Sequence, residues 1–428
     1  MRVELSINNF PAKAATALLV LCACAILSYA IISNFIVSAL TDERASVARE
    51  TLSAAAEYIP NSGRLHARLA EVSEKEGEMA EAQSHALRAI NLSPFNYNYH
   101  LLLATIKESN GEPSAAEQSL REAIKLAPNK TEPHWQLANL LLRSGKLGQA
   151  AREFRASCAL NNRLLPVTLN IVWRASAGRL DATEAVTGND ARSRLALAEF
   201  LLKQSRVVEA ASVFNQIERK ERMLPEGREF INALVASDQL EVARDIWIDL
   251  AGDNAKDGSL IYNGSFESDI SKDFAQFNWV IDRSDYAKIR ILAGQARTGT
   301  RALRIDFTGR DTTRLTSEIR QLIVLSPGVR YRLECYAKAE NLVTSEGPRV
   351  AVTTKADPNW IAMSEPVASG QAGWQHLSIE FTAPEISEGK AAAFHVTVRR
   401  KPKFSYDQPT VGTICFDDFT LAEVKESR

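Results

Sequence analysis

The sequence lacks several features that would mark a narrower class of protein. Its 428 residues include only five cysteines, which excludes a small scaffold held together by many disulfides. The 51 Lys and Arg residues are balanced by 52 Asp and Glu residues, so the chain has no excess positive charge with which to bind nucleic acid broadly. The phosphate-binding GxxxxGKS loop, the GxSxG elbow and the HExxH zinc motif are all missing. We therefore expect no nucleic-acid partner and no enzymatic activity.

One long apolar run lies near the N-terminus. No charged side chain occurs from residue 14 to residue 41, and about 20 apolar residues in a helix are enough to cross a bilayer. A cleaved signal peptide has a shorter apolar core, of about 7–15 residues, so we predict an uncleaved transmembrane anchor at 14–40. Arg2 and Lys13 precede the run, which favours a cytoplasmic N-terminus at 1–13. The prediction is a single-pass protein of the inner (cytoplasmic) membrane whose C-terminal domains are periplasmic or extracellular. A cleaved signal sequence is the alternative.

A repeat with a period of 34 residues follows. Glycine, alanine, proline and leucine each recur three times at this step. The recurring residues are Gly77, Gly111, Gly145, Ala82, Ala116, Ala150, Pro60, Pro94, Pro128, Leu69, Leu103 and Leu137. A fixed period of this length indicates a helical solenoid, in which Gly allows the turn between two helices and Pro ends the second helix. We predict units at 63–96, 97–130 and 131–164, within a helical region of 43–253 whose repeat pattern weakens toward its end.

The repeat resembles the tetratricopeptide (TPR) family in its period and in the order of its small residues. In the second unit these residues are Leu103, Ala104, Gly111, Ala116, Leu120, Ala123 and Pro128. Stacked repeats leave an extended concave surface, which in this family binds peptides or proteins. The resemblance therefore implies a protein partner, and it places Asn98, Leu101, Trp135, Asn139 and Arg143 in the groove. For Trp135, packing between helices is an equal alternative.

Three histidines at one repeat position raise the question of a metal site. His66, His100 and His134 are each 34 residues apart, so neighbouring histidines should be separated by about the width of one repeat. Zinc needs its ligands about 2 Å from a common centre. We therefore expect these histidines to be structural.

The pattern changes after a polar linker that follows Leu250. The apolar period switches from 3.6 to 2, and turn sequences separate the alternating segments. These segments contain Leu303-Ile305-Phe307, Tyr331-Leu333-Cys335-Ala337, Val350-Val352, Leu377-Ile379-Phe381 and Phe394-Val396-Val398. Many short alternating strands predict an antiparallel sandwich or jelly roll.

The same region resembles carbohydrate-binding modules of the family 4/9 type, which are galactose-binding-domain-like jelly rolls. The similarity covers 259–425 and rests on LIYNGSFES, ARTGTRALRIDF, LSPGVRYRLECYAKAEN, GWQHLSIEFTAPE and ICFDDFTLAEV. The resemblance implies a saccharide ligand, although many relatives have other roles. It also implies a structural calcium held by Glu267 and by Asp417 or Asp418, since carboxylate oxygens suit calcium. A solvated pair of strand-end carboxylates is the alternative, and no other cofactor is expected.

Sugar recognition needs aromatic faces together with polar side chains in a cleft or loop. The aromatic candidates are Trp279, Tyr286, Trp360 and Tyr406, and the polar ones are Gln276, Arg290, Glu318 and Asn359. Trp374 opens an apolar strand, so we expect it in the core. The basic run 399–403 is either a solvated strand end or a contact for anionic glycan or lipid headgroups. Whether Cys335 and Cys415 form a disulfide stays open.

The predicted architecture is therefore multidomain: a transmembrane helix, an all-α TPR-like solenoid and an all-β jelly-roll sandwich. It suits a non-catalytic, membrane-anchored scaffold that binds a protein through the solenoid and a saccharide through the sandwich. Assembly of exopolysaccharide or envelope glycan is a setting that would use both domains. The alternative is a structural envelope-assembly protein whose sandwich binds protein and no glycan.

Overall fold

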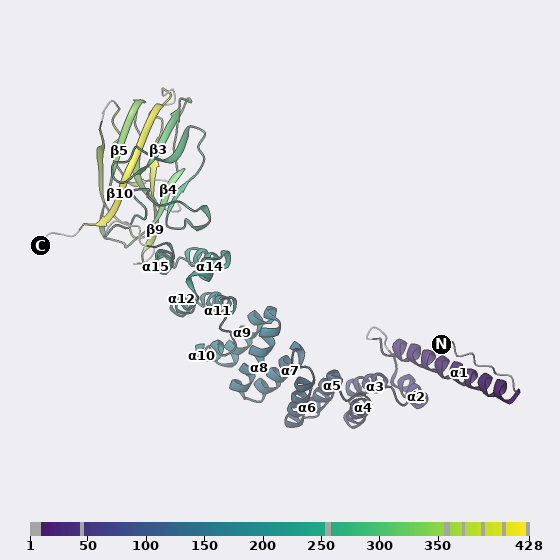
Figure 1. The fold of residues 1–428 in the computed structure, drawn as a ribbon. Coiled ribbons are helices and arrows are strands. Elements are labelled where there is room, and N and C mark those ends of the chain that lie inside the picture. The colour runs from purple at the N-terminus through teal and green to yellow at the C-terminus, as the bar shows by residue number, and fades with distance from the viewer. Residues whose placement is uncertain are drawn as a thin grey trace. The chain divides into compact units, whose positions relative to one another are not determined.

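The computed structural model describes residues 10–42, 47–252, 258–354, 360–369, 373–386, 390–404 and 408–424. The chain folds into two compact units, Met1–Asn189 and Asp190–Arg428. The first unit contains the apolar helix and the regular repeats, and the second contains further helices together with the β-sandwich (Figure 1).

The apolar run forms one long helix, α1 (Phe10–Leu40). Within it, Lys13–Leu40 has a mean hydropathy of 2.5, and none of its most apolar window is buried by the rest of the protein. This length and composition are sufficient for a membrane span, and a signal sequence near an N-terminus has the same properties.

The three predicted repeat units are confirmed, each as a pair of helices. The helices are α3 (Gly63–Glu76), α4 (Met79–Leu92), α5 (Tyr97–Ser109), α6 (Pro113–Leu126), α7 (Thr131–Arg143) and α8 (Leu147–Leu160). Each turn between paired helices contains a glycine with positive φ, such as Gly77 at 87°, a conformation that a side chain disfavours. Ala82, Ala116 and Ala150 are fully buried. The preceding helix α2 (Arg49–Tyr58) covers the first unit, since its Leu52 packs on Leu65 and Leu69 of α3.

The remaining helices keep the paired pattern less regularly. The short helix η1 (Asn162–Leu164) leads into α9 (Leu165–Ala175), and α10 (Leu180–Glu184) completes the first unit. The second unit begins with α11 (Ala191–Lys203), α12 (Val207–Asn215), α13 (Arg219–Arg222), α14 (Pro225–Ala236) and α15 (Leu240–Ala251). Phe214 and Phe230 stack between α12 and α14 with ring centroids 4.5 Å apart.

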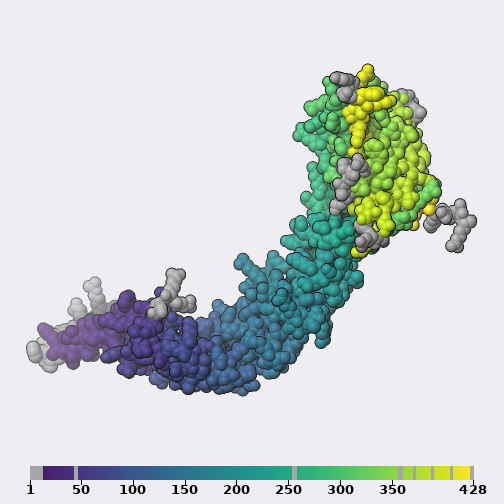
Figure 2. All heavy atoms as spheres, turned by 180° about the vertical axis from the view of Figure 1, so that it is seen from behind, coloured from purple at the N-terminus to yellow at the C-terminus, as the bar shows by residue number. Residues whose placement is uncertain are grey.

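The C-terminal region is the predicted antiparallel sandwich of two five-stranded sheets. We call β1-β4-β9-β6-β7 the first sheet and β2-β3-β10-β5-β8 the second sheet. Their strands are β1 (Trp279–Ile281), β2 (Ala287–Ala293), β3 (Arg301–Thr308), β4 (Ile319–Leu325), β5 (Arg330–Val343), β6 (Arg349–Thr354), β7 (Trp360–Met363), β8 (Gln375–Thr382), β9 (Ala392–Arg399) and β10 (Val411–Glu423), and the short helix η2 (Lys272–Phe274) precedes them. Alternate residues of both sheets, such as Leu303, Val352 and Phe394, form one core. β10 is the central strand of the second sheet, between β3 and β5, and the yellow atoms of this last strand are visible on the surface in Figure 2.

Within the second unit, helix α15 is joined to the sandwich by an aromatic cluster around Trp247. The Trp247 ring stacks on Phe274 at 5.3 Å and meets Tyr262 edge-on at 4.7 Å. Its Nε1–H donates to Gln276 Oε1 at 3.1 Å, and the Gln276 amide donates to Asn232 Oδ1 of α14 at 2.9 Å. Gln276, expected at a sugar site, therefore connects the helices to the sandwich.

Candidate binding surfaces

The repeats form a pocket between α5 and α7 that contains three of the five predicted groove residues. Trp135, Asn139 and Arg143 line it together with Glu108 and Glu132. Asn98 is exposed at the start of α5 and is not part of this pocket. Leu101 is only 7% exposed, so its prediction as a groove contact is wrong, because its side chain belongs to the helix core.

The polar side chains of this pocket hold one another in place. The Arg143 guanidinium on α7 donates to Glu108 Oε1 on α5 at 2.6 and 2.9 Å. The Asn139 amide donates to the Trp135 carbonyl at 2.8 Å. The Trp135 ring also meets Phe154 edge-on at 5.3 Å. Trp135 thus packs between helices and lines the groove at the same time.

The repeated histidines make bonds that explain their spacing. His66 Nε2 lies 3.1 Å from the Pro60 carbonyl, and His134 Nε2 lies 3.1 Å from the Pro128 carbonyl. Each therefore ties the start of one repeat to the end of the preceding one. The other ring nitrogen of His66 lies 3.2 Å from His85 Nδ1, and that of His134 lies 2.7 Å from Glu153. These pairs connect the two helices of one repeat, a structural role.

Of the aromatic residues proposed for sugar binding, one is well exposed. Trp360, the first residue of β7, is 47% exposed. Trp279 is fully buried against Phe266 and Phe419, and its Nε1–H donates to the Asn263 carbonyl at 3.1 Å. The expected exposure of Trp279 is therefore wrong, because the indole fills the core. Tyr286 is half-buried beside β2. Tyr406 and Asn359 lie outside the described residues.

Trp360 adjoins the outward side of the first sheet, which is unusually buried. Val352, Val396 and Val398 point into the core, so the alternating residues Thr353, Thr397 and Arg399 point away from it. These three are nevertheless only 5%, 2% and 4% exposed. We call this outward side, with Trp360 at its edge opposite Thr353, the recessed face. The Thr397 hydroxyl is buried there and has no hydrogen-bond partner among the described residues.

A pocket of about 170 Å³ opens at the edge of the recessed face. It is lined by Glu346, Gly347, Arg349, Trp360, Met363, Arg399, Arg400, Lys401 and Pro402. Lys401 Nζ lies 5.0 Å from the centre of the Trp360 ring, within the range of a cation–π contact. The Arg349 guanidinium donates to Glu346 and to the Ser364 carbonyl. The pocket thus combines an aromatic face with several cations.

The basic run is only partly the solvated strand end that was one expectation. Arg400 is 1% exposed, and its guanidinium donates to the Thr313 carbonyl and to Thr344 Oγ1. Arg399 is also buried, and this burial lowers the pKa of its guanidinium, against the opposing effect of Glu318. Lys401 is exposed. Two guanidiniums of the run are therefore built into the protein, and the charge available to a ligand lies beside Trp360.

The carboxylates proposed for calcium are occupied by hydrogen-bond donors of the 297–301 segment. Glu267 accepts from the backbone N–H groups of Thr300 and Arg301, each at 2.8 Å. Asp417 Oδ2 accepts from the Arg297 N–H at 2.7 Å, and Asp418 pairs with the Arg297 guanidinium at 2.8 Å. Burial raises the pKa of Asp417, although these N–H groups oppose the shift.

This arrangement does not fit a shared cation. The Arg297 guanidinium already pairs with Asp418, and Asp417 and Glu267 each accept backbone N–H groups. Across the part of the chain that the structure describes, no group of three or more His, Cys, Asp or Glu side chains is placed to hold a metal.

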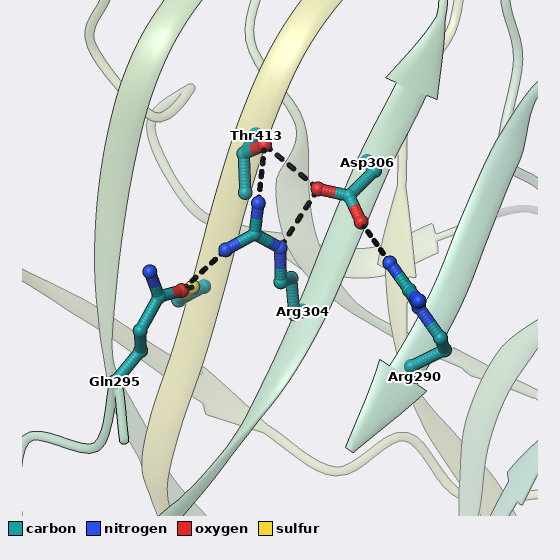
Figure 3. Close-up of polar contacts among 6 residues, drawn as sticks. Arg290, Gln295, Arg304, Asp306 and Thr413 are labelled. Carbon is teal, nitrogen blue, oxygen red and sulfur yellow. Dashed lines mark hydrogen bonds and ion pairs between the residues drawn. The ribbon is translucent and has the colours of Figure 1, made fainter. Parts of the chain in front are cut away.

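The outward side of the second sheet carries a polar network that sequence reasoning did not identify. Asp306 accepts from the guanidiniums of Arg290 and Arg304 at 2.7 and 2.8 Å, and from the Thr413 hydroxyl at 2.8 Å (Figure 3). Arg304 also donates to Gln295 Oε1 at 2.6 Å. The alternation along each strand would have predicted that these residues share the outward side of the sheet. In each strand they alternate with the residues that point into the core. In this network each charge is already paired within the sheet.

Two further expectations concern this sheet. Cys335 points into the core, whereas the Cys415 thiol donates to Gln295 on the outward side at 3.3 Å, so the two lie on opposite faces and both are free. Trp374 is half-buried one residue before β8, and the assignment to the core is wrong. Because side chains alternate along a strand, Trp374 shares the outward side with His376, two residues later, and not the inward side with Leu377.

Comparisons with known proteins agree with this architecture. A carbohydrate binding domain model of the 4/9 type matches residues 258–403, and a tetratricopeptide repeat model matches residues 101–163. No significant match was found among curated proteins. Similar solved structures include a crystal structure of MamA protein, at 12% identity over 44% of this chain and 92% of that chain, with a TM-score of 0.28.

Two further structures are similar to parts of the chain. One is described as CBM4 structure and function, at 21% identity over 38% of this chain and 99% of that chain, with a TM-score of 0.27. The other is the Yersinia enterocolitica type III secretion chaperone SycD with a peptide of the translocator YopD, at 18% identity over 28% of this chain and 88% of that chain, with a TM-score of 0.24. The chain thus carries tetratricopeptide repeats followed by a C-terminal carbohydrate-binding domain of the 4/9 type.

Proposed function

We propose that the protein is a non-catalytic scaffold anchored in a membrane by α1, whose repeats bind a protein and whose sandwich binds a saccharide. Tetratricopeptide repeats and carbohydrate-binding domains are both non-catalytic kinds of domain. The apolar helix supports the anchor. In this proposal α1 lies in the inner membrane, the repeats and the sandwich that follow it are periplasmic, and the scaffold serves assembly of exopolysaccharide or envelope glycan. That setting rests on the combination of domains, which is an argument by analogy.

The observation that carries the saccharide function is the recessed face with Trp360 at its edge. Sugar sites combine a flat apolar surface with a few polar groups that fix orientation. Trp360 supplies an exposed ring, and the pocket that it lines adds the polar side chains of Glu346, Arg349 and Lys401. The paired network of the second sheet offers no comparable group.

Glycan binding by the full chain in lipid nanodiscs tests this function. Trp360→Ala should weaken binding by about 5- to 150-fold, because stacking on an exposed indole contributes about 1–3 kcal/mol by analogy with base stacking on aromatic side chains. Trp374→Ala is the matched control, since Trp374 directly precedes β8 of the second sheet, and it should leave the affinity unchanged. Equal losses in both variants would place the ligand elsewhere. Binding of protein but of no glycan would favour the alternative, a structural envelope-assembly protein.

The protein-binding function is assigned to the pocket between α5 and α7. Its lining includes the exposed Arg143 together with the half-buried Glu108, Asn139 and Trp135. Arg143→Ala should weaken capture of a partner from a membrane extract while leaving the helical circular dichroism signal unchanged. Arg121→Ala is the matched control, because Arg121 is also exposed and paired with a glutamate, Glu117, but does not line this pocket. Identical capture by both variants would exclude this groove as the partner site.

A further inference from the structure

We infer that the saccharide bound beside Trp360 is acidic, and that the pocket at the edge of the recessed face recognises a carboxylate-bearing sugar. This inference rests on the proposed saccharide function and names its ligand class. Four cationic side chains, Arg349, Arg399, Arg400 and Lys401, line the pocket against a single carboxylate, that of Glu346.

The four cations are not equally available to a ligand. The Arg400 guanidinium is held by the Thr313 carbonyl and the Thr344 hydroxyl, so it serves the fold. The Arg349 guanidinium pairs with Glu346, and this pair neutralises both charges. Arg399 and Lys401 remain. The Lys401 ammonium has no carboxylate partner among the described residues and contacts the Trp360 ring instead.

The position of Lys401 distinguishes acidic from neutral sugars. The ammonium lies over the same ring on which a sugar would stack, 5.0 Å from its centre. A neutral sugar would displace this ammonium and lose a cation–π contact, which contributes about 0.5–1 kcal/mol at an exposed site. A carboxylate on the stacked sugar would give the displaced ammonium a new partner at the edge of the ring. Charge-assisted bonds of this kind are about twice as strong as neutral ones.

The burial of Arg399 adds to this preference. Arg399 lines the pocket, is 4% exposed, and its pKa is lowered by loss of solvation. An anion entering the pocket would offset that loss, whereas a neutral group would not. Anionic lipid headgroups share this chemistry, but those of phosphatidylglycerol and phosphatidylserine offer no ring to stack on Trp360. The exposed indole therefore favours a polysaccharide.

The experiment compares polymers that differ only in charge. The full chain in phosphatidylcholine nanodiscs is titrated with polygalacturonate and alginate, and with the same two polymers after reduction of their carboxyl groups to alcohols. We expect the acidic form of at least one polymer to bind tenfold or more tightly than its reduced form, and this difference to shrink as salt is raised. Lys401→Gln should abolish the difference. Lys403→Gln is the control, because Lys403 does not line the pocket, and it should retain the difference.

Each contrary outcome identifies what fails. Equal binding of acidic and reduced polymers, with Trp360 still required, would overturn the charge inference and leave the saccharide function standing. Binding of neither form of either polymer would overturn both. Binding of phosphatidylglycerol vesicles that depends on Lys401, without binding of any polymer, would reassign the pocket to lipid headgroups.

Discussion

Replacing Trp247 should loosen the attachment of the last helices to the sandwich. The indole lies on α15, stacks on Phe274, meets Tyr262 edge-on and donates to Gln276. Removing a buried Trp side chain costs about 3–5 kcal/mol. Trp247→Ala should reach that range, because the indole is 1% exposed and contacts Tyr262 and Phe274 of the sandwich. Trp247→Phe keeps the stacked ring and loses the hydrogen bond, so it should cost only about 1–2 kcal/mol.

Hydrogen exchange measured by mass spectrometry on the full chain resolves this effect locally. A loss of about 3 kcal/mol corresponds to roughly 150-fold more frequent opening, so peptides from α15 and from residues 272–281 should exchange faster by about that factor in Trp247→Ala. Peptides from α5, which lies in the other compact unit, are the internal control and should not change. Unchanged exchange of α15 in Trp247→Ala, or equal effects of the Ala and Phe variants, would refute the reasoning.

Three other predictions concern the repeats and the carboxylates. Burial and the neighbouring His66 lower the pKa of His85. The repeats should therefore lose stability as the pH falls below about 6.5, where the histidine of the unfolded chain takes up a proton. His85→Ser should flatten this dependence in thermal melts between pH 5 and 8, and an unchanged slope would contradict the pairing of His85 with His66. Ala116→Leu should lower repeat stability by about 1–3 kcal/mol through overpacking of a fully buried site, and an unchanged melting temperature would count against the helix contact. Because the carboxylates around Asp417 already accept N–H groups, chelation with EDTA should leave the melting temperature of the sandwich unchanged, and a drop would restore the calcium hypothesis.

The repeats were predictable because each repeat position has one physical role. Gly77 and its equivalents adopt positive φ, and Ala116 and its equivalents are fully buried, so residue type alone marks the helix boundaries. The alternation of Leu303-Ile305-Phe307 and of Leu377-Ile379-Phe381 likewise predicted strands of the sandwich core. The same alternation would have placed Trp374 outside the core, had its parity been compared with that of Leu377.

The binding surfaces were less predictable because exposure depends on long-range packing. Trp279 and Trp360 both occur at the start of short strands, yet one is fully buried and the other is 47% exposed. The alternating pattern of a strand predicts that its outward residues are exposed, so it does not predict the burial of Thr397 and Arg399. Nor does the sequence reveal that Gln276 contacts Trp247, since the two lie on either side of the polar linker.

The location of a bound polysaccharide tests the central claim most directly. Hydrogen exchange of the full chain with and without a saturating glycan compares the two faces of the sandwich in one experiment. Binding at the recessed face predicts slower exchange in peptides that cover β6, β7 and β9, and unchanged exchange in β3 and β10 of the second sheet. Slower exchange in β3 and β10 alone would place the ligand on the polar network around Asp306 and contradict the assignment to Trp360.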